Sequence, residues 1–158
     1  MRVAVLEGLP AALSPGFAGI LRDAGQILVV GGLANRRVLD QLGEIAPVTA
    51  VVAHRDFLAL GDVYPESAHL EIEGARIYLA HMIGTPPEFL PPVREMLAHD
   101  PPDVIAHGHV PRAQVIWIGG TLFVCPGRAT PAPGQAATCA LLDIDGPGRI
   151  TAHVLDIQ

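Results

Sequence analysis

Short apolar runs alternate with amphipathic stretches in the first third of the chain. Residues 2–6, 26–30 and 48–52 are rich in Val, Ile and Leu, which is typical of buried parallel strands. Ser14-Pro15 and Asn35 are suited to start helices in the two intervals. Apolar side chains then follow at helical spacing: Phe17, Ile20, Leu21, Val38, Leu39 and Leu42. This strand–helix alternation predicts a parallel sheet with right-handed crossovers.

The pattern changes in the middle of the chain. Residues 69–73 alternate polar and apolar side chains, which is typical of a half-buried antiparallel strand. Gly74-Ala75 then predicts a turn into residues 76–80 as the hairpin partner. A Pro-rich loop at 85–92 then leads to a short helix, and residues 104–106 predict another buried strand. The last third predicts hairpins that join 114–118 to 121–124 and 138–144 to 150–157. We expect a single domain, residues 1–158, with a mixed sheet on an antiparallel one and helices outside.

The composition narrows the class of protein. Half of the residues are hydrophobic, so a packed core is expected, and the net charge of -6 argues against a nucleic-acid partner. All ten basic residues are Arg, which excludes chemistry that needs a lysine. No apolar run approaches the roughly 18 residues of a membrane span, and no signal peptide is visible. We expect Cys125 and Cys139 to be buried free thiols of a cytoplasmic protein.

Polar residues stand where several predicted strands end, and open α/β sheets carry their chemistry at such ends. Imidazoles occur at three of these tips, in His54, His81 and His107-Gly108-His109. Neutral imidazoles suit zinc and related metals, and three of them with a fourth position open form a catalytic zinc arrangement. A hydrogen-bonded loop histidine is the plainer alternative for each. Three further histidines are expected on the surface: His69, His99 and His153.

The order of elements and several tips resemble the calcineurin-like metallophosphoesterase superfamily, in particular its small bacterial phosphodiesterase and VPS29-like branch. The family motifs are Asp-x-His, Gly-Asp, Gly-Asn-x-Asp, His and Gly-His-x-His. This chain has Gly108-His109 at the last motif and Cys125-Pro126-Gly127-Arg128 at the family's Asn-Pro-Gly-Ser turn. The resemblance covers essentially the whole chain. It implies an α/β fold, a four-layer α/β/β/α sandwich of two mixed sheets flanked by helices, with a two-metal site at the strand ends.

Four ligand positions of the family are lost. Gly8 and Pro10 replace the first Asp and His, Gly32 replaces the bridging Asp, and Pro111 replaces the final His. The nearby acid Glu7 is shifted by one residue, so we expect its side chain to face the other way. Two-metal hydrolysis needs a bridging ligand. The resemblance therefore implies a degraded dinuclear site, with hydrolysis lost or much reduced and a residual binding or scaffold role. The expected partner is a phosphate-containing small molecule or a protein.

Other positions keep their chemistry. His81 and His109 stand at family ligand positions, His54 replaces the Asn of the third motif, and Asp56 matches its closing carboxylate. The alternative function is a single-metal phosphodiesterase or phosphatase. In it the three histidines hold one divalent ion, most suitably Zn²⁺, and Asp56 orients a ligand or acts as base. Three arginines are candidates for anion contacts: Arg55, Arg112 and Arg128.

A Rossmann-like nucleotide binder is a third interpretation, suggested by the opening strand–helix–strand order. No GxGxxG sequence follows the first strand, which argues against it.

Overall fold

The computed structural model describes residues 1–158. Its strands are β1 (Arg2–Leu6), β2 (Gln26–Val30), β3 (Val48–Val51), β4 (Ser67–Ile72), β5 (Ala75–Ala80), β6 (Gly84–Thr85), β7 (Glu88–Phe89), β8 (Val104–His107), β9 (Gln114–Ile118), β10 (Thr121–Cys125), β11 (Thr138–Ile144) and β12 (Ile150–Asp156). Its helices are α1 (Pro15–Leu21), α2 (Arg36–Gly43), α3 (Phe57–Leu60) and α4 (Pro91–His99), with a 3-10 helix at His54–Asp56. No helix is both long and apolar enough to span a bilayer.

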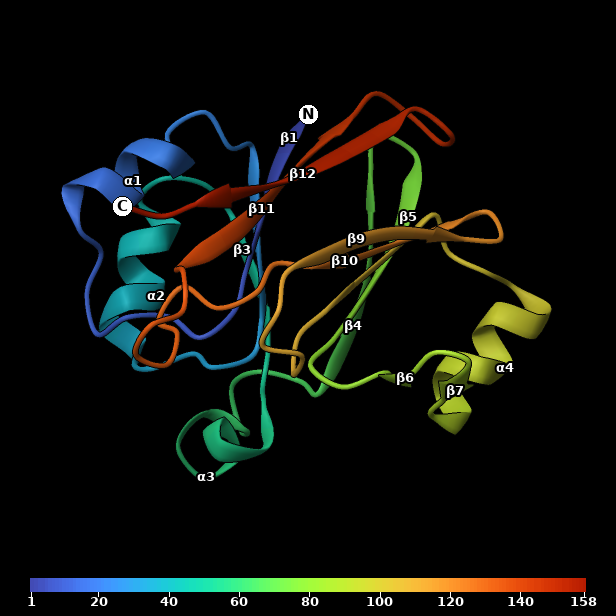
Figure 1. The fold of residues 1–158 in the computed structure, drawn as a ribbon, viewed down its shortest axis with the longest axis horizontal. Helices are drawn as coiled ribbons and strands as arrows, with labels where there is room; N and C mark the ends of the chain where they lie inside the picture. Colours follow the sequence, from blue (N-terminus) through green and yellow to red (C-terminus); the bar gives the residue numbers. More distant parts are fainter.

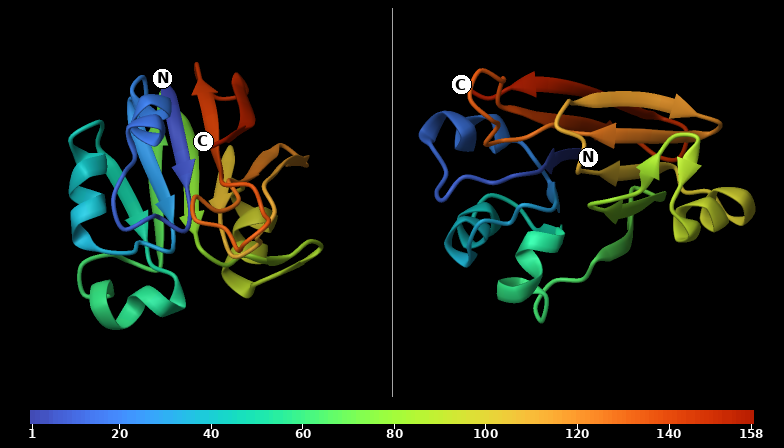
Figure 2. Two further views of the ribbon diagram at one scale, coloured as in Figure 1. Left: turned by 60° about the vertical axis from the view of Figure 1, so that its left-hand side comes forward. Right: turned by 60° about the horizontal axis from the view of Figure 1, so that its bottom comes forward.

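The strands form two five-stranded sheets that face each other (Figures 1 and 2). The first has the order β12-β11-β1-β2-β3, and β1, β2 and β3 run parallel. The second has the order β4-β5-β8-β10-β9, with three parallel central strands and antiparallel strands at both edges. Both sheets are therefore mixed, as the family resemblance implied.

The antiparallel second sheet expected from the apolar pattern is wrong. Each of its two hairpins, β4-β5 and β9-β10, does form, but β8 inserts between them and pairs in parallel with β5 and β10. The connection from β5 to β8 passes through α4, a crossover that only a parallel pairing requires. The sequence predicted the two hairpins and the strand at residues 104–106, but it carried no signal that this strand pairs between the hairpins.

The local signals explain where the first helices begin. Ser14 Oγ accepts a hydrogen bond from the Phe17 N–H at 3.1 Å, and Asn35 Oδ1 accepts one from the Val38 N–H at 3.0 Å. Both caps were predicted, and Pro15 occupies the first turn of α1 as expected. The β4-β5 turn lies at Glu73-Gly74 rather than Gly74-Ala75. Both of its residues have positive φ, 52° and 78°, which matches the twist of a tight hairpin.

Three apolar clusters separate the layers. Between the sheets lie side chains such as Val5, Leu28, Leu79 and Val124. Helices α1 and α2 cover the outer face of the first sheet, and α4 covers that of the second (Figure 1). The result is the four-layer α/β/β/α arrangement expected from the resemblance. Cys125 and Cys139 are buried free thiols, as predicted, and burial raises the pKa of each to about 11.

The inter-sheet core gives a direct test of the layer packing. Leu79→Ala removes a fully buried side chain between the sheets, and we expect a loss of about 2–5 kcal/mol in the free energy of unfolding. Leu58→Ala changes a completely exposed leucine of α3 and should stay within about 0.5 kcal/mol. Urea denaturation of both variants measures the difference. Equal losses would contradict the packing described here.

Candidate functional site

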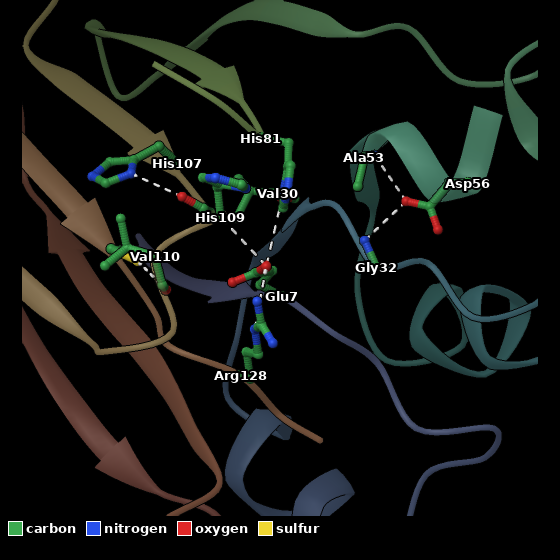
Figure 3. A network of polar contacts seen from close by, with 12 residues as sticks. Glu7, Val30, Gly32, Ala53, Asp56, His81, His107, His109, Val110 and Arg128 are labelled. Atoms are coloured by element: carbon green, nitrogen blue, oxygen red, sulfur yellow. Dashed lines mark hydrogen bonds and ion pairs between the residues drawn. The ribbon is translucent and has the colours of Figure 1, made fainter. Parts of the chain in front are cut away.

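The carboxyl ends of the parallel strands from both sheets meet at one side of the molecule (Figure 3). Gly8 follows β1, Gly31 and Gly32 follow β2, and the 3-10 helix with Asp56 follows β3. From the second sheet, His81 follows β5 and His109 follows β8. The strand ends therefore meet at one place, as the sequence predicted.

Glu7 is at the centre of this region (Figure 3). Its side chain is completely buried, and Oε1 accepts the backbone N–H of His109 at 3.4 Å. The same oxygen lies 3.8 Å from His81 Nδ1 and 3.9 Å from Arg128 Nε. Burial raises the pKa of Glu7, against the lowering effects of the His109 N–H and the two nearby arginines. We call Glu7, His81, His109 and Arg128 the Glu7 cluster.

The expectation that Glu7 faces away from the site is wrong. Val3 and Val5 of β1 face the second sheet, while Ala4 and Leu6 face the helices. Glu7 continues this alternation on the side of the second sheet, and His81 and His109 lie on that side. The sequence signal that could have identified Glu7 was simple: it is an acid directly after a buried apolar strand. Two polar atoms of the cluster, Glu7 Oε2 and Arg128 Nε, are buried without a hydrogen-bond partner in the chain.

His81 is held in one tautomer. Its Nδ1 lies 2.8 Å from the carbonyl oxygen of Val30, which can only accept, so Nδ1 carries the proton. A β-carbon placed on Gly31 would lie 2.5 Å from the same Nδ1, so only glycine leaves room for the ring. Burial lowers the pKa of His81, which keeps the imidazole neutral. Its ring lies edge-on to that of His109, with centroids 5.5 Å apart.

The other two histidines of interest lie in different surroundings. His54 is exposed and lines a cavity of about 550 Å³ together with His81. His107 is buried against Phe123, and burial lowers its pKa. No group of three or more His, Cys, Asp or Glu side chains is close enough to hold a metal ion. His69, His99 and His153 are exposed, as predicted.

Asp56 is buried and bound to backbone. Its carboxylate accepts N–H groups from Gly32 at 2.9 Å, Leu33 at 3.1 Å and Ala53 at 2.8 Å. These bonds join the tip of β2 to the tip of β3 (Figure 3). Asp56 therefore holds the ends of β2 and β3 together.

The tips of β1 and β2 are bonded directly to each other. The Gly8 N–H donates to the Gly31 carbonyl at 3.1 Å, and the Leu9 N–H donates to the Gly32 carbonyl at 2.7 Å. A β-carbon placed on Gly32 would lie 2.6 Å from the Cα of Gly8. The backbone therefore fills the space in which a side chain at position 32 would begin.

Two of the three candidate arginines reach these tips. Arg55 lines a second cavity, of about 320 Å³, beside Gly8 and Gly32. The stem of Arg128 covers Gly8, with its Cβ 3.6 Å from the position of a β-carbon on that glycine. Arg112 is exposed and is not part of the lining of this cavity.

Comparison with solved structures finds the same fold in several proteins. Vps29 from Chaetomium thermophilum is 19% identical, with a TM-score of 0.74 over 99% of this chain and 96% of that one. The same protein has been solved with a cyclic peptide. Wild-type Vps29 from Entamoeba histolytica, solved with Zn²⁺, is 20% identical, with a TM-score of 0.70 over 100% of both chains.

A predicted phosphoesterase from Streptococcus pneumoniae is also similar, at 17% identity and a TM-score of 0.66 over 98% of this chain and 97% of that one. Among curated proteins, no sequence matches the chain significantly. The profile of the calcineurin-like phosphoesterase superfamily domain matches residues 10–147. The chain therefore belongs to the calcineurin-like phosphoesterase superfamily.

Proposed function

We propose that this chain is a binding or scaffold protein built on the phosphoesterase fold, without the family's two-metal hydrolytic centre. The observation that carries the proposal is the direct hydrogen bonding of the β1 and β2 tips at Gly8 and Gly32. The family resemblance assigns the bridging aspartate to position 32. A β-carbon there would meet the Gly8 backbone at 2.6 Å, so the bridge between two cations has no room.

The remaining positions support the same proposal. Gly8, Pro10 and Pro111 offer no side-chain donor to a cation, and hard ions such as Mn²⁺ or Mg²⁺ require oxygen ligands. Asp56 is the one acid that matches a family motif, but it already accepts three backbone hydrogen bonds. Within this proposal Asp56 is a positioning residue, not a base.

The surface near the site offers a place for a protein partner. Phe57, Met82 and Leu90 line the 550 Å³ cavity and are each between 39% and 52% exposed. Leu58, beside Phe57 in the chain, is fully exposed. Clustered apolar side chains of this kind mark interaction sites in soluble proteins. The peptide complex of the Chaetomium protein, which has this fold, is consistent with such a role.

Two further points belong to the proposal. The chain forms a single domain over residues 1–158, since the two sheets share one core. It works in the cytoplasm, because its two thiols are unpaired and buried.

The second candidate function is a single-metal phosphodiesterase or phosphatase. The favouring observation is the orientation of His81, whose Nδ1 is bonded to a backbone carbonyl and whose Nε2 is left free, as in metal-ligating histidines. His109 lies beside it, and His54 shares its cavity. The zinc in the Entamoeba relative supports a divalent metal for this candidate, and imidazole ligands favour zinc.

Metal content and turnover separate the two functions. The protein, purified without a histidine tag, is analysed for bound zinc and assayed on bis-p-nitrophenyl phosphate with added Zn²⁺ or Mn²⁺. We expect no stoichiometric zinc and no turnover above that of His81→Ala, because no three ligands converge on one ion. The matched control is His153→Ala, which changes an exposed histidine of β12. Stoichiometric zinc, with turnover that His81→Ala abolishes and His153→Ala preserves, would sink the scaffold proposal.

The structural role of Asp56 has its own test. Asp56→Ala leaves three backbone N–H groups without their acceptor, so we expect a loss on the order of 3 kcal/mol in the free energy of unfolding. Asp62→Ala, at an exposed aspartate in the turn after α3, should change stability by less than about 0.5 kcal/mol. Thermal and urea unfolding measure both. An Asp56→Ala variant of unchanged stability would contradict the role proposed here.

A further inference from the structure

The cavity of about 320 Å³ beside the β1 and β2 tips is lined by two glycines and an arginine among other residues. Gly8 and Gly32 in its lining have no side chains, and Arg55 and Thr130 are the lining residues with side-chain donors. Its volume is at the lower end of the roughly 300–1,000 Å³ range of small-molecule sites. The space is therefore large enough for a tetrahedral oxyanion with a short substituent.

The position of Arg55 depends on glycine at position 32. Its Nη2 lies 3.2 Å from the point that a Gly32 β-carbon would occupy, so the guanidinium lies against the bare backbone. Arg55 is exposed and takes part in none of the ion pairs of the structure. Its side chain also forms none of the hydrogen bonds within the chain, so its donors are free to bind a ligand.

The charges around the cavity favour an anion. Asp56 is the one acid in the lining, and both of its oxygens are directed at backbone N–H groups. Arg128 is also outside the lining, but its stem covers Gly8 and brings a second guanidinium to the β1 tip, where its buried Nε has no hydrogen-bond partner. Glu7 opposes an anion, but it is fully buried, lies outside the lining and is 3.9 Å from Arg128.

We infer that this cavity binds a phosphate-type oxyanion through the guanidinium of Arg55, with Arg128 as a second positive charge and no metal ion. The planar donors of a guanidinium match two oxygens of such an anion. Thr130 also lines the cavity, and a threonine hydroxyl can donate one further hydrogen bond. This inference deepens the proposed binding role by naming its ligand chemistry, and it rests on that role in requiring no metal. It also departs from the family, in which metal ions supply the positive charge.

The test titrates inorganic phosphate into the intact protein in the presence of EDTA and follows ¹H–¹⁵N NMR spectra. We expect saturable shifts at the amides of Gly32, Ala34 and Thr130, which lie around the cavity. Arg55→Ala should weaken binding on the order of tenfold or more, because it removes charge-assisted hydrogen bonds. Arg55→Lys should bind with intermediate affinity, since it keeps the charge and loses the planar fork.

The control variant is Arg94→Ala, an exposed arginine of α4 on the far side of the second sheet, which should bind phosphate as the unchanged protein does. The same titration is repeated with Zn²⁺ in place of EDTA. Absence of binding under both conditions, or full binding by Arg55→Ala in EDTA, overturns the inference and leaves the proposed function intact. Binding that requires Zn²⁺ and disappears in EDTA overturns both, because a metal would then hold the anion.

Discussion

The hydrogen-bonded contact between the tips of β1 and β2 is the constraint on which the rest of the site depends. Gly8 and Leu9 donate to the carbonyls of Gly31 and Gly32, at 3.1 Å and 2.7 Å. Asp56 then links the β2 tip to the β3 tip through three further bonds. Three strand ends are thereby fixed by hydrogen bonds among backbone groups and the Asp56 carboxylate. In a metal centre the same ends would be held by their side chains and the ions between them.

The electrostatics of the site follow from that backbone closure. Glu7 projects into the site from the end of β1, its Oε2 has no hydrogen-bond partner in the chain, and burial raises its pKa. Burial lowers the pKa of His81, whose Nδ1 proton is directed at the Val30 carbonyl. The strongest fixed charges left at the tips are the guanidinium groups of Arg55 and Arg128. The region therefore combines two guanidinium groups with the buried carboxyl groups of Glu7 and Asp56.

Local sequence signals predicted many of the helices and strands. They did not predict the pairing of strands that are far apart in the sequence. The Ser14 and Asn35 caps and the buried strands of the first sheet depend on neighbours in the sequence, so they could be read directly. The parallel insertion of β8 between two hairpins depends on pairing across long separations and was available only through the family resemblance. At the site, the sequence predicted that histidines stand at the strand ends. The part played by Glu7 was missed because it depends on where the second sheet places His81 and His109. The backbone bonds of Asp56 were missed because they depend on where the β2 tip turns.

Guanidinium and metal ions meet the same electrostatic need with different chemical consequences. A divalent ion neutralises a phosphoryl group and also lowers the pKa of a bound water, which creates the nucleophile for hydrolysis. An arginine neutralises and orients the same group, but it stays protonated far above neutral pH, so it neither activates water nor donates a proton there. The one acid in the cavity lining, Asp56, is engaged with backbone and is not free to act as a base. A site in which Arg55 supplies the charge would thus separate recognition of a phosphate from its hydrolysis. Under the proposed function, the glycines at the β1 and β2 tips and the placement of the arginines would be two parts of one binding site.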